Sequence, residues 1–181
     1  MKIDLGCGPN KKEGFIGVDQ YEMNNVDLIL DIGKEIFPWD DGEVEEFHCS
    51  HFFEHLKAEE RIHVVNEMFR CLQEGGKVTI ITPHWASNRA YGDLTHQWPP
   101  VCEMFYYYLK KEWRLANAPH LDSSFNDKGY NCDFDATWGY SFSPELNAKN
   151  QDYVQFALAN FKEVIHDLHA SLIKPITKQE V

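Results

Sequence analysis

The sequence predicts an α/β fold, a single domain with a Rossmann-like, mainly parallel sheet flanked by helices. The order of the elements supports this prediction, because four short apolar runs precede an amphipathic segment and a fifth run follows it. Each run ends in turn residues or a carboxylate, and alternation of this type is typical of a mainly parallel sheet. The 181 residues, 43% of them hydrophobic, are enough for one domain with a sizeable core.

The first expected strand ends at Leu5 and breaks into a glycine turn, Gly6-Cys7-Gly8-Pro9-Asn10. A turn of this kind lets the backbone approach a bound ligand that a Cβ would keep away. The second expected strand, 15–19, ends in Asp19, and only nine residues, 6–14, separate it from the first. A parallel crossover normally takes a dozen or more residues, usually with a helix. We therefore expect a bare loop here, with at most one turn of helix.

Three further apolar runs are expected strands: 26–30, 46–50 and 77–82. The first is followed directly by Asp31. The helix between the last two is expected over 58–72, because apolar side chains recur there at steps of three and four. These side chains are Ile62, Val65, Phe69 and Leu72. Gly75-Gly76 is expected to end the helix, since glycine adopts a positive φ past the last turn.

The second half of the sequence is less regular. Residues 84–100 are expected to form a long loop rich in His, Trp and Asp, and 101–115 to form a helix. Residues 134–142 fit one or two short strands. Apolar residues at helical spacing predict a long helix over 150–172. Long loops without secondary structure are often functional, so we expect the 84–100 loop to contribute to a site.

The charge balance argues against nucleic acid as the main substrate. Seventeen basic and 29 acidic residues give a formal net charge of -12, which repels a phosphate backbone unless Lys and Arg gather on one face. The longest basic run is Lys110-Lys111. We therefore expect a substrate other than nucleic acid.

The cysteines predict a reducing compartment. Five cysteines is an odd number, and their wide spacing includes no Cys-x-x-Cys pair, as expected for reduced thiols in a cytosol. The sequence opens on no apolar targeting segment, and its apolar runs are too short for a membrane span. We expect a cytoplasmic protein with no membrane partner, and the sequence does not predict an oligomeric state.

The segment 4–10, Asp-Leu-Gly-Cys-Gly-Pro-Asn, resembles the first motif of class I S-adenosylmethionine-dependent methyltransferases. Further segments follow in the order of that family: 17–19, 27–31, 50–56 and 70–77. The resemblance covers about residues 1 to 100. The short 11–14 link and the Asp-Leu-Thr-His segment at 93–96 look like a compact subgroup that lacks the first crossover helix. Asn10 stands where the family has a third glycine.

The resemblance implies S-adenosyl-L-methionine as cofactor and methyl transfer to a small-molecule or glycan acceptor, at oxygen or nitrogen. Asp19 would accept hydrogen bonds from the ribose hydroxyls, and Asp31 with Ile32 would contact the adenine. Residues 1–83 would form the cofactor-binding core, and 84–181 the lid, the acceptor region and a C-terminal helix. The implied cofactor-binding residues are Asp4, Gly6, Cys7, Gly8, Asp19, Asp31, Ile32, Ser50 and His51.

An acceptor hydroxyl would need a base, and histidine is the usual one. His84, directly after the fifth expected strand, is the first candidate, with His51 and His96 behind it. Asp93 could orient a histidine. These side chains could converge above the strand ends as a base, as a metal site or as hydrogen-bonded loop residues. The sequence alone assigns no metal ligand.

Two other functions stay open. A non-catalytic S-adenosylmethionine-binding or partner subunit is one, because Asn10 and the shortened crossover depart from the family pattern. A zinc hydrolase is the other, because His51-x-x-Glu54-His55 matches the inverted zinc-peptidase pattern. That pattern requires both histidines on a long helix, whereas here it directly follows an expected strand. The sequence therefore favours a structural turn at this point.

Overall fold

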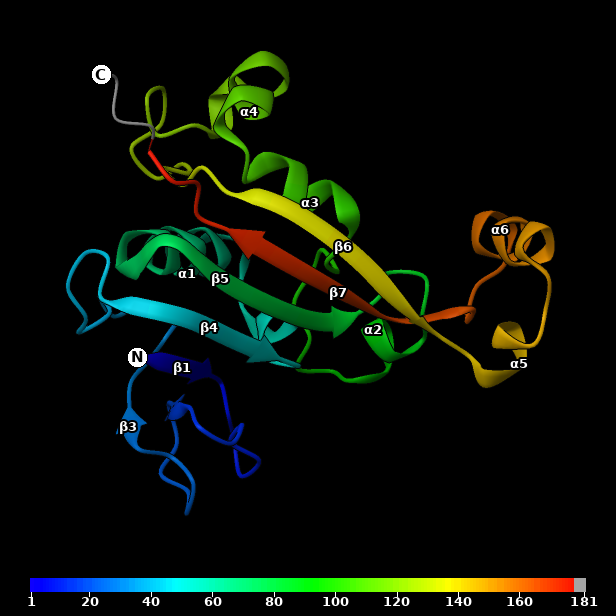
Figure 1. Ribbon diagram of the computed structural model, residues 1–181, viewed down its shortest axis with the longest axis horizontal. Helices are drawn as coiled ribbons and strands as arrows, with labels where there is room; N and C mark the ends of the chain where they lie inside the picture. Colours follow the sequence, from blue (N-terminus) through cyan, green and yellow to red (C-terminus); the bar gives the residue numbers. More distant parts are fainter. Residues whose placement is uncertain (178–181) are drawn as a thin grey trace.

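The computed structural model describes residues 1–177, and within them seven strands form one sheet in the order β3-β2-β1-β4-β5-β7-β6 (Figure 1). The first five strands are mutually parallel, whereas β7 runs antiparallel to both β5 and β6. The strands are β1 (Lys2–Leu5), β2 (Ile16–Asp19), β3 (Leu28–Ile29), β4 (Val44–Ser50), β5 (Leu72–Pro83), β6 (Asp135–Phe142) and β7 (Ile165–Ile173). The mainly parallel sheet predicted from the sequence is confirmed.

The helices of the described chain are mostly short. They are η1 (Phe53–His55), α1 (Ala58–Cys71), α2 (Arg89–Gly92), α3 (Glu103–Tyr108), α4 (Lys111–Asn117), η2 (Pro119–Leu121), α5 (Pro144–Asn147) and α6 (Gln151–Asn160). In Figure 1, α5 and α6 stand apart from the rest, beyond the end of the β6–β7 pair. No helix within residues 1–177 has the length and apolar composition needed to cross a membrane.

One face of the sheet carries the core. Side chains such as Ile3, Phe47, Val78 and Leu172 are fully buried and belong to one large apolar cluster with α1. Several of the alternate positions are polar: His48, Thr79 and Ser171 occupy one register row across β4, β5 and β7. Because successive side chains of a strand point to opposite faces, this row faces away from the core.

The turn after β1 contains no helix, as the short 6–14 link predicted. The chain leaves β1 toward β2 and β3 on one side, then returns to form β4 on the other side of β1. This reversal of strand order lies between β1 and β4. In open α/β sheets, ligands bind in the crevice at the carboxyl ends of the strands at such a point.

The helix expected near the C-terminus was wrong in extent. The helix expected over 150–172 ends at Asn160 as α6, and Ile165–Ile173 is strand β7. Leu168, Ala170 and Leu172 alternate with less buried residues, and ladders on both sides satisfy the backbone. The apolar residues at 161–168 fit both the helical and the strand period. The strand forms here because its backbone hydrogen-bonds to two neighbouring strands, β5 and β6. The C-terminal element of the described chain is therefore a strand.

Smaller corrections concern segment ends. The 101–115 helix is two helices, α3 and α4. The expectation of one or two short strands over 134–142 is confirmed, since β6 is a single strand there. Helix α1 ends at Cys71, before Gly75-Gly76. Gly75, with φ at 75°, lies within β5 and does not cap the helix.

A buried ion pair organises the segment after α3. Arg114 and Asp122 have side chains 0% and 1% exposed, and an Arg114 Nη lies 2.7 Å from Asp122 Oδ2. The guanidinium also donates to the carbonyl oxygens of Tyr108 and Cys132, at 2.6 and 3.0 Å. The pair therefore joins α4 to the chain on both sides of it.

We expect Asp122→Ala to lower the free energy of unfolding by about 3–5 kcal/mol, because it leaves Arg114 buried without its counter-charge. Urea unfolding measures this, and Asp127→Ala, at an exposed site, is the matched control. A loss below about 1 kcal/mol would show that water reaches the guanidinium.

The same carboxylate gives a pH dependence. Burial raises the pKa of Asp122, but hydrogen bonds from Ser124 and Arg114 outweigh it and bring the pKa to about 2. This is below the value of about 3.9 for an unfolded chain, so the carboxylate stabilises the fold above that pH. Its contribution is lost as the pH falls toward 2. The difference in unfolding free energy between wild type and Asp122→Ala should shrink over that range.

Candidate functional site

The glycine turn after β1 is held in place by its neighbours. The backbone N–H groups of Gly6 and Cys7 donate to the carbonyl oxygen of Val18, at 2.8 and 3.2 Å. Gly6 has φ 65° and Gly8 has φ 50°, both in the left-handed region that glycine adopts without strain. The turn therefore brings the backbone close to the ends of β1 and β2.

The space over Gly6 is filled by the chain itself. A Cβ at Gly6 would lie 2.2 Å from Cγ of Phe52, whereas a Cβ at Gly8 would meet nothing among the described residues within 4 Å. The close approach that Gly6 permits is thus used by the aromatic ring of Phe52. In this conformation a ligand reaches the turn at Gly8 but not at Gly6.

Asp19 and Asp31 lie at the ends of neighbouring strands. The carboxylate of Asp19 accepts hydrogen bonds from the N–H groups of Gly8 and Tyr21, both at 3.0 Å. Each carboxylate oxygen has a second lone pair, so both can accept another donor. The carboxylate of Asp31 lies 2.7 Å from Nζ of Lys34. Asp19 is therefore held against the glycine turn with lone pairs to spare, whereas Asp31 is paired with Lys34.

A cavity of about 100 Å³ lies beside these strand ends. Asp31 and Ile32 line it, and Gln20, Phe52 and His55 are also among its walls. Ligand pockets usually measure about 300–1,000 Å³, so this one is small for a nucleoside. A nucleoside would require the walls, Phe52 in particular, to move apart.

Asp4, Cys7 and Ser50 lie around the turn. Asp4 is buried and accepts a hydrogen bond from the Lys12 N–H at 2.8 Å, which ties down the 6–14 loop. Burial raises the pKa of Asp4, and it raises the pKa of the Cys7 thiol to about 11. Ser50 is the half-buried last residue of β4. Asp4 thus stabilises the glycine turn through its hydrogen bond to the loop that follows it.

A second cavity, of about 360 Å³, contains three of the four predicted catalytic residues. His51, Asp93 and His96 line it, together with Glu54 and His55. Pro83, Arg89 and Gly92 complete the walls. The structure thus brings the segment after β4 and the loop after β5 together around one hollow.

The fourth predicted residue, His84, is not among those walls, and the structure does not support it as the base. Nδ1 of His84 accepts the N–H of Ala86 at 3.1 Å, so the ring proton is on Nε2, which lies 3.0 Å from the carboxylate of Glu103. The hydrogen bond from His84 lowers the pKa of Glu103 to about 2. Both nitrogens of this buried ring are occupied, and the pair joins the end of β5 to α3.

The zinc-peptidase pattern is not formed. His51 has φ 52° and precedes a helical turn, η1, that spans only Phe53–His55. The two histidines of the pattern therefore do not lie one turn apart on a helix. Instead Nδ1 of His51 lies 3.3 Å from Oε1 of Glu54, and this contact raises the pKa of His51.

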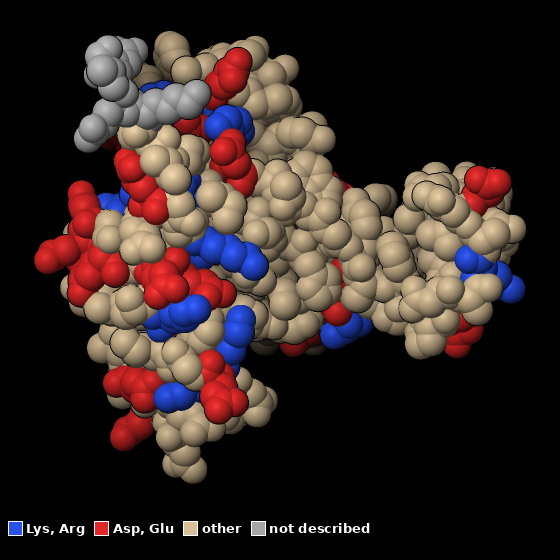
Figure 2. Space-filling model, in the orientation of Figure 1, with Lys and Arg blue, Asp and Glu red and all other residues tan. Residues whose placement is uncertain are grey.

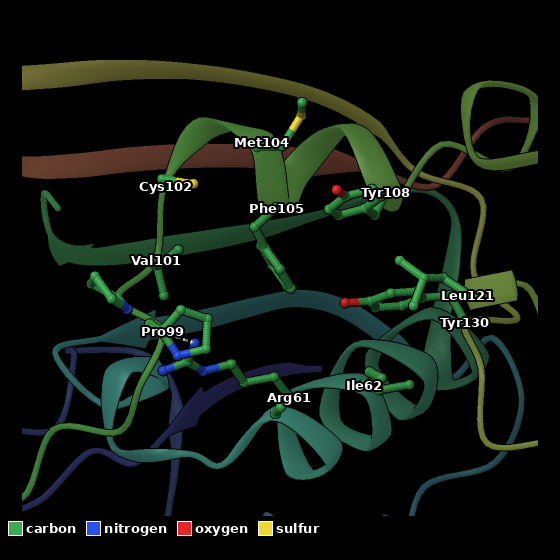
Figure 3. Close-up of a pocket in the computed structure, with 12 residues that line it drawn as sticks. Arg61, Ile62, Pro99, Val101, Cys102, Met104, Phe105, Tyr108, Leu121 and Tyr130 are labelled. Atoms are coloured by element: carbon green, nitrogen blue, oxygen red, sulfur yellow. Dashed lines mark hydrogen bonds between the residues drawn. The ribbon is translucent and has the colours of Figure 1, made fainter. Parts of the chain in front are cut away.

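Sequence reasoning missed Arg61. Its buried guanidinium donates to the carbonyl oxygens of Pro99, Gln97 and Glu54, at 2.6, 3.2 and 3.3 Å. The sequence did contain one signal for a buried Arg61: this charged residue directly precedes Ile62, the first apolar residue of the α1 pattern. Arg61 also bounds a cavity of about 440 Å³, into which Phe105 and Tyr130 point (Figure 3). The walls of this larger, apolar cavity include no predicted site residue.

We expect Gly8→Ala to lower the free energy of unfolding by about 1–2 kcal/mol, the cost of a left-handed residue with a Cβ. Gly6→Ala should cost more, because the Phe52 ring must also move. Gly92→Ala is the control, since its Cβ would meet nothing within 4 Å among the described residues. Urea unfolding compares the three, and equal losses at Gly6 and Gly8 would show that the ring yields freely.

No family model matches the chain, and no curated protein matches it in sequence. Several solved structures are similar in fold. A SAM-dependent methyltransferase from Archaeoglobus fulgidus is 18% identical, with 96% of this chain and 85% of that chain covered and a TM-score of 0.66. The YcgJ protein from Bacillus subtilis is 11% identical, with 97% and 92% covered and a TM-score of 0.51.

A third similar structure is described as the [4+2]-cyclase SpnF. It is 14% identical, with 97% of this chain and 75% of that chain covered and a TM-score of 0.53. At identities this low the likeness concerns the fold. The chain therefore has the fold of class I S-adenosylmethionine-dependent methyltransferases, as its sequence predicted.

Proposed function

We propose that the protein transfers a methyl group from S-adenosyl-L-methionine to a small-molecule or glycan acceptor. One observation carries the proposal: the carboxylate of Asp19 accepts a hydrogen bond from the glycine turn at the carboxyl ends of β1 and β2, in a sheet that has the methyltransferase fold. The A. fulgidus structure is described as a SAM-dependent methyltransferase, which supports the same chemistry here.

The residues present fit the adenosyl part of this cofactor. Asp19 has lone pairs for two ribose hydroxyls, Gly8 is open, and Asp31 with Ile32 lines a cavity suited to an adenine once it widens. The methionine part would approach Gly6 only after the ring of Phe52 turns aside. This rotation is part of the proposal.

When bound, S-adenosyl-L-methionine supplies an activated methyl group on a sulfonium leaving group. The chain's own task is then to align the acceptor and exclude water. His51 directly follows β4 and its Nδ1 lies beside Glu54, so Nε2 is the nitrogen that would take the proton of an acceptor hydroxyl. His96, whose Nε2 lies 3.9 Å from Oδ2 of Asp93, is the second candidate for this proton transfer.

The charge distribution supports a small-molecule or glycan acceptor. On the face shown in Figure 2, Asp and Glu side chains crowd around the Lys and Arg side chains. With a net charge of -12, such a surface repels a phosphate backbone. A cytoplasmic location is part of the proposal, because the structure leaves all five cysteines unpaired.

A second candidate function is cofactor binding without turnover. Phe52 over Gly6 and the cavity of only about 100 Å³ favour it, because both restrict the methionine end. One measurement distinguishes the two functions. A methyltransferase and a non-catalytic protein would both bind S-adenosylhomocysteine, but only the methyltransferase would form it from S-adenosylmethionine in the presence of an acceptor.

We expect Asp19→Asn to weaken S-adenosylhomocysteine binding at least tenfold, because a hydrogen bond to a charged group contributes about 1.5–3 kcal/mol. Titration calorimetry measures this. Asp40→Asn is the matched control, since Asp40 is exposed and distant in sequence from the turn. Equal affinity of Asp19→Asn and wild type would contradict the ribose assignment.

We expect His51→Ala to slow methyl transfer by about 10²–10⁴-fold, the usual contribution of a general base, with cofactor binding retained. The assay follows S-adenosylhomocysteine formation over a panel of hydroxylated and amino compounds and oligosaccharides. Unchanged turnover in His51→Ala would assign the proton transfer to another group. Absence of turnover over the panel, with cofactor binding intact, would favour the non-catalytic alternative.

A further inference from the structure

Three side chains in the 360 Å³ cavity form a cluster that the proposed methyl transfer does not use as a unit. Glu54, His55 and His96 each offer one ligand atom, and these atoms all lie within 4.8 Å of one another. Two come from η1 and one from the loop after β5. We call Glu54, His55 and His96 the EHH cluster.

The hydrogen bonds of both histidines place their lone pairs on Nε2. Nδ1 of His96 lies 3.2 Å from the carbonyl oxygen of Ala90, which only accepts, so His96 carries its proton on Nδ1. Nδ1 of His55 lies 2.9 Å from Oγ1 of Thr95, whose own hydrogen is donated to Asp93 at 2.7 Å. His55 must therefore donate from Nδ1 as well.

The carboxylate of Glu54 is incompletely paired among the described residues. Its side chain is 6% exposed, and Oε1 lies 3.3 Å from His51. Oε2 is buried without a hydrogen-bond partner among residues 1–177. Buried polar atoms are seldom unpaired, because the lost hydration is costly. A cation at this atom would supply the missing interaction.

The two segments of the cluster are fastened to each other. The N–H of Gln97, next to His96, donates to the carbonyl oxygen of Glu54 at 2.9 Å, and the rings of His55 and His96 are 4.8 Å apart. Two cations lie nearby: Arg89 is paired with Asp167 at 2.9 Å, and the buried Arg61 donates to backbone carbonyl oxygens, including that of Glu54 at 3.3 Å. The two segments that carry the ligands are thus held side by side.

We propose that the EHH cluster binds a divalent transition-metal ion, with Zn²⁺ the expected one. Two imidazole nitrogens and a carboxylate are a ligand set of zinc sites that keep a position open. Ligating histidines usually donate their other N–H to a carbonyl or a similar acceptor, as His96 and His55 do here. Bonds of about 2.0–2.2 Å require the three groups to draw closer together.

The ion would lie in the cavity that His51 also lines, with its open position available to an oxygen ligand. The inference does not depend on the proposed methyl transfer, because it concerns ion binding by the chain alone. It differs from the zinc-peptidase pattern in its ligands: Glu54 binds the ion and His51 does not.

Titration calorimetry with ZnCl₂, and visible absorption with Co²⁺ as a spectroscopic probe, test the proposal. We expect about one ion per chain. Glu54→Gln, His55→Ala and His96→Ala should each weaken Zn²⁺ binding at least tenfold, and Thr95→Val by about 10–100-fold, since it frees the ring of His55. Circular dichroism and thermal melting check that each variant folds.

Two further variants discriminate between ligand sets. His120→Ala, at an exposed histidine elsewhere on the chain, should leave Zn²⁺ affinity unchanged. His51→Ala removes only a contact to the ligand Glu54, so it should weaken Zn²⁺ binding less than Glu54→Gln does. Absence of Zn²⁺ binding by the wild-type protein would overturn the proposal. So would equal losses in His120→Ala and His96→Ala, or loss in His51→Ala with binding retained in Glu54→Gln.

Discussion

The buried guanidinium of Arg61 holds the two halves of the candidate site together. It donates to the carbonyl oxygen of Glu54, after β4, and to those of Gln97 and Pro99, in the loop after β5. Burial lowers the pKa of this guanidinium, and three carbonyl oxygens replace part of its lost hydration. One further backbone bond, from Gln97 to Glu54, joins the same segments. Arg61 and this backbone bond therefore both hold His96 beside Glu54.

The sequence predicted the parallel part of the fold because each of its strands is a short apolar run with its own turn signal. It failed at 165–173, where Leu168 and Leu172 fit helical and strand periods equally well. The partners that decide, β5 and β6, are distant in sequence, so no local pattern shows them. The same is true of Gly75, which lies within a strand, although a glycine after a helix usually caps it.

For the site, position at a strand end was the informative signal. His51 and His96 share a cavity because they follow β4 and β5, whose carboxyl ends are neighbours. His84 also follows β5, but Glu103 of α3 and the backbone of Ala86 occupy its ring. Those contacts form only on folding, so spacing alone could not separate a buried structural histidine from one that faces the cavity. Arg61 was missed for the same reason.

The fold does not settle the reaction, because similar structures include both a SAM-dependent methyltransferase and a [4+2]-cyclase. The reaction must therefore be decided by the side chains at the strand ends. Here several of them lie in one short segment, 52–55, just after β4. Phe52 covers Gly6, while Glu54 and His55 of the next turn face the second cavity. His55 lines both cavities. A ligand that displaces Phe52 from the glycine turn therefore acts on the backbone that positions Glu54 and His55, so the two cavities are not independent.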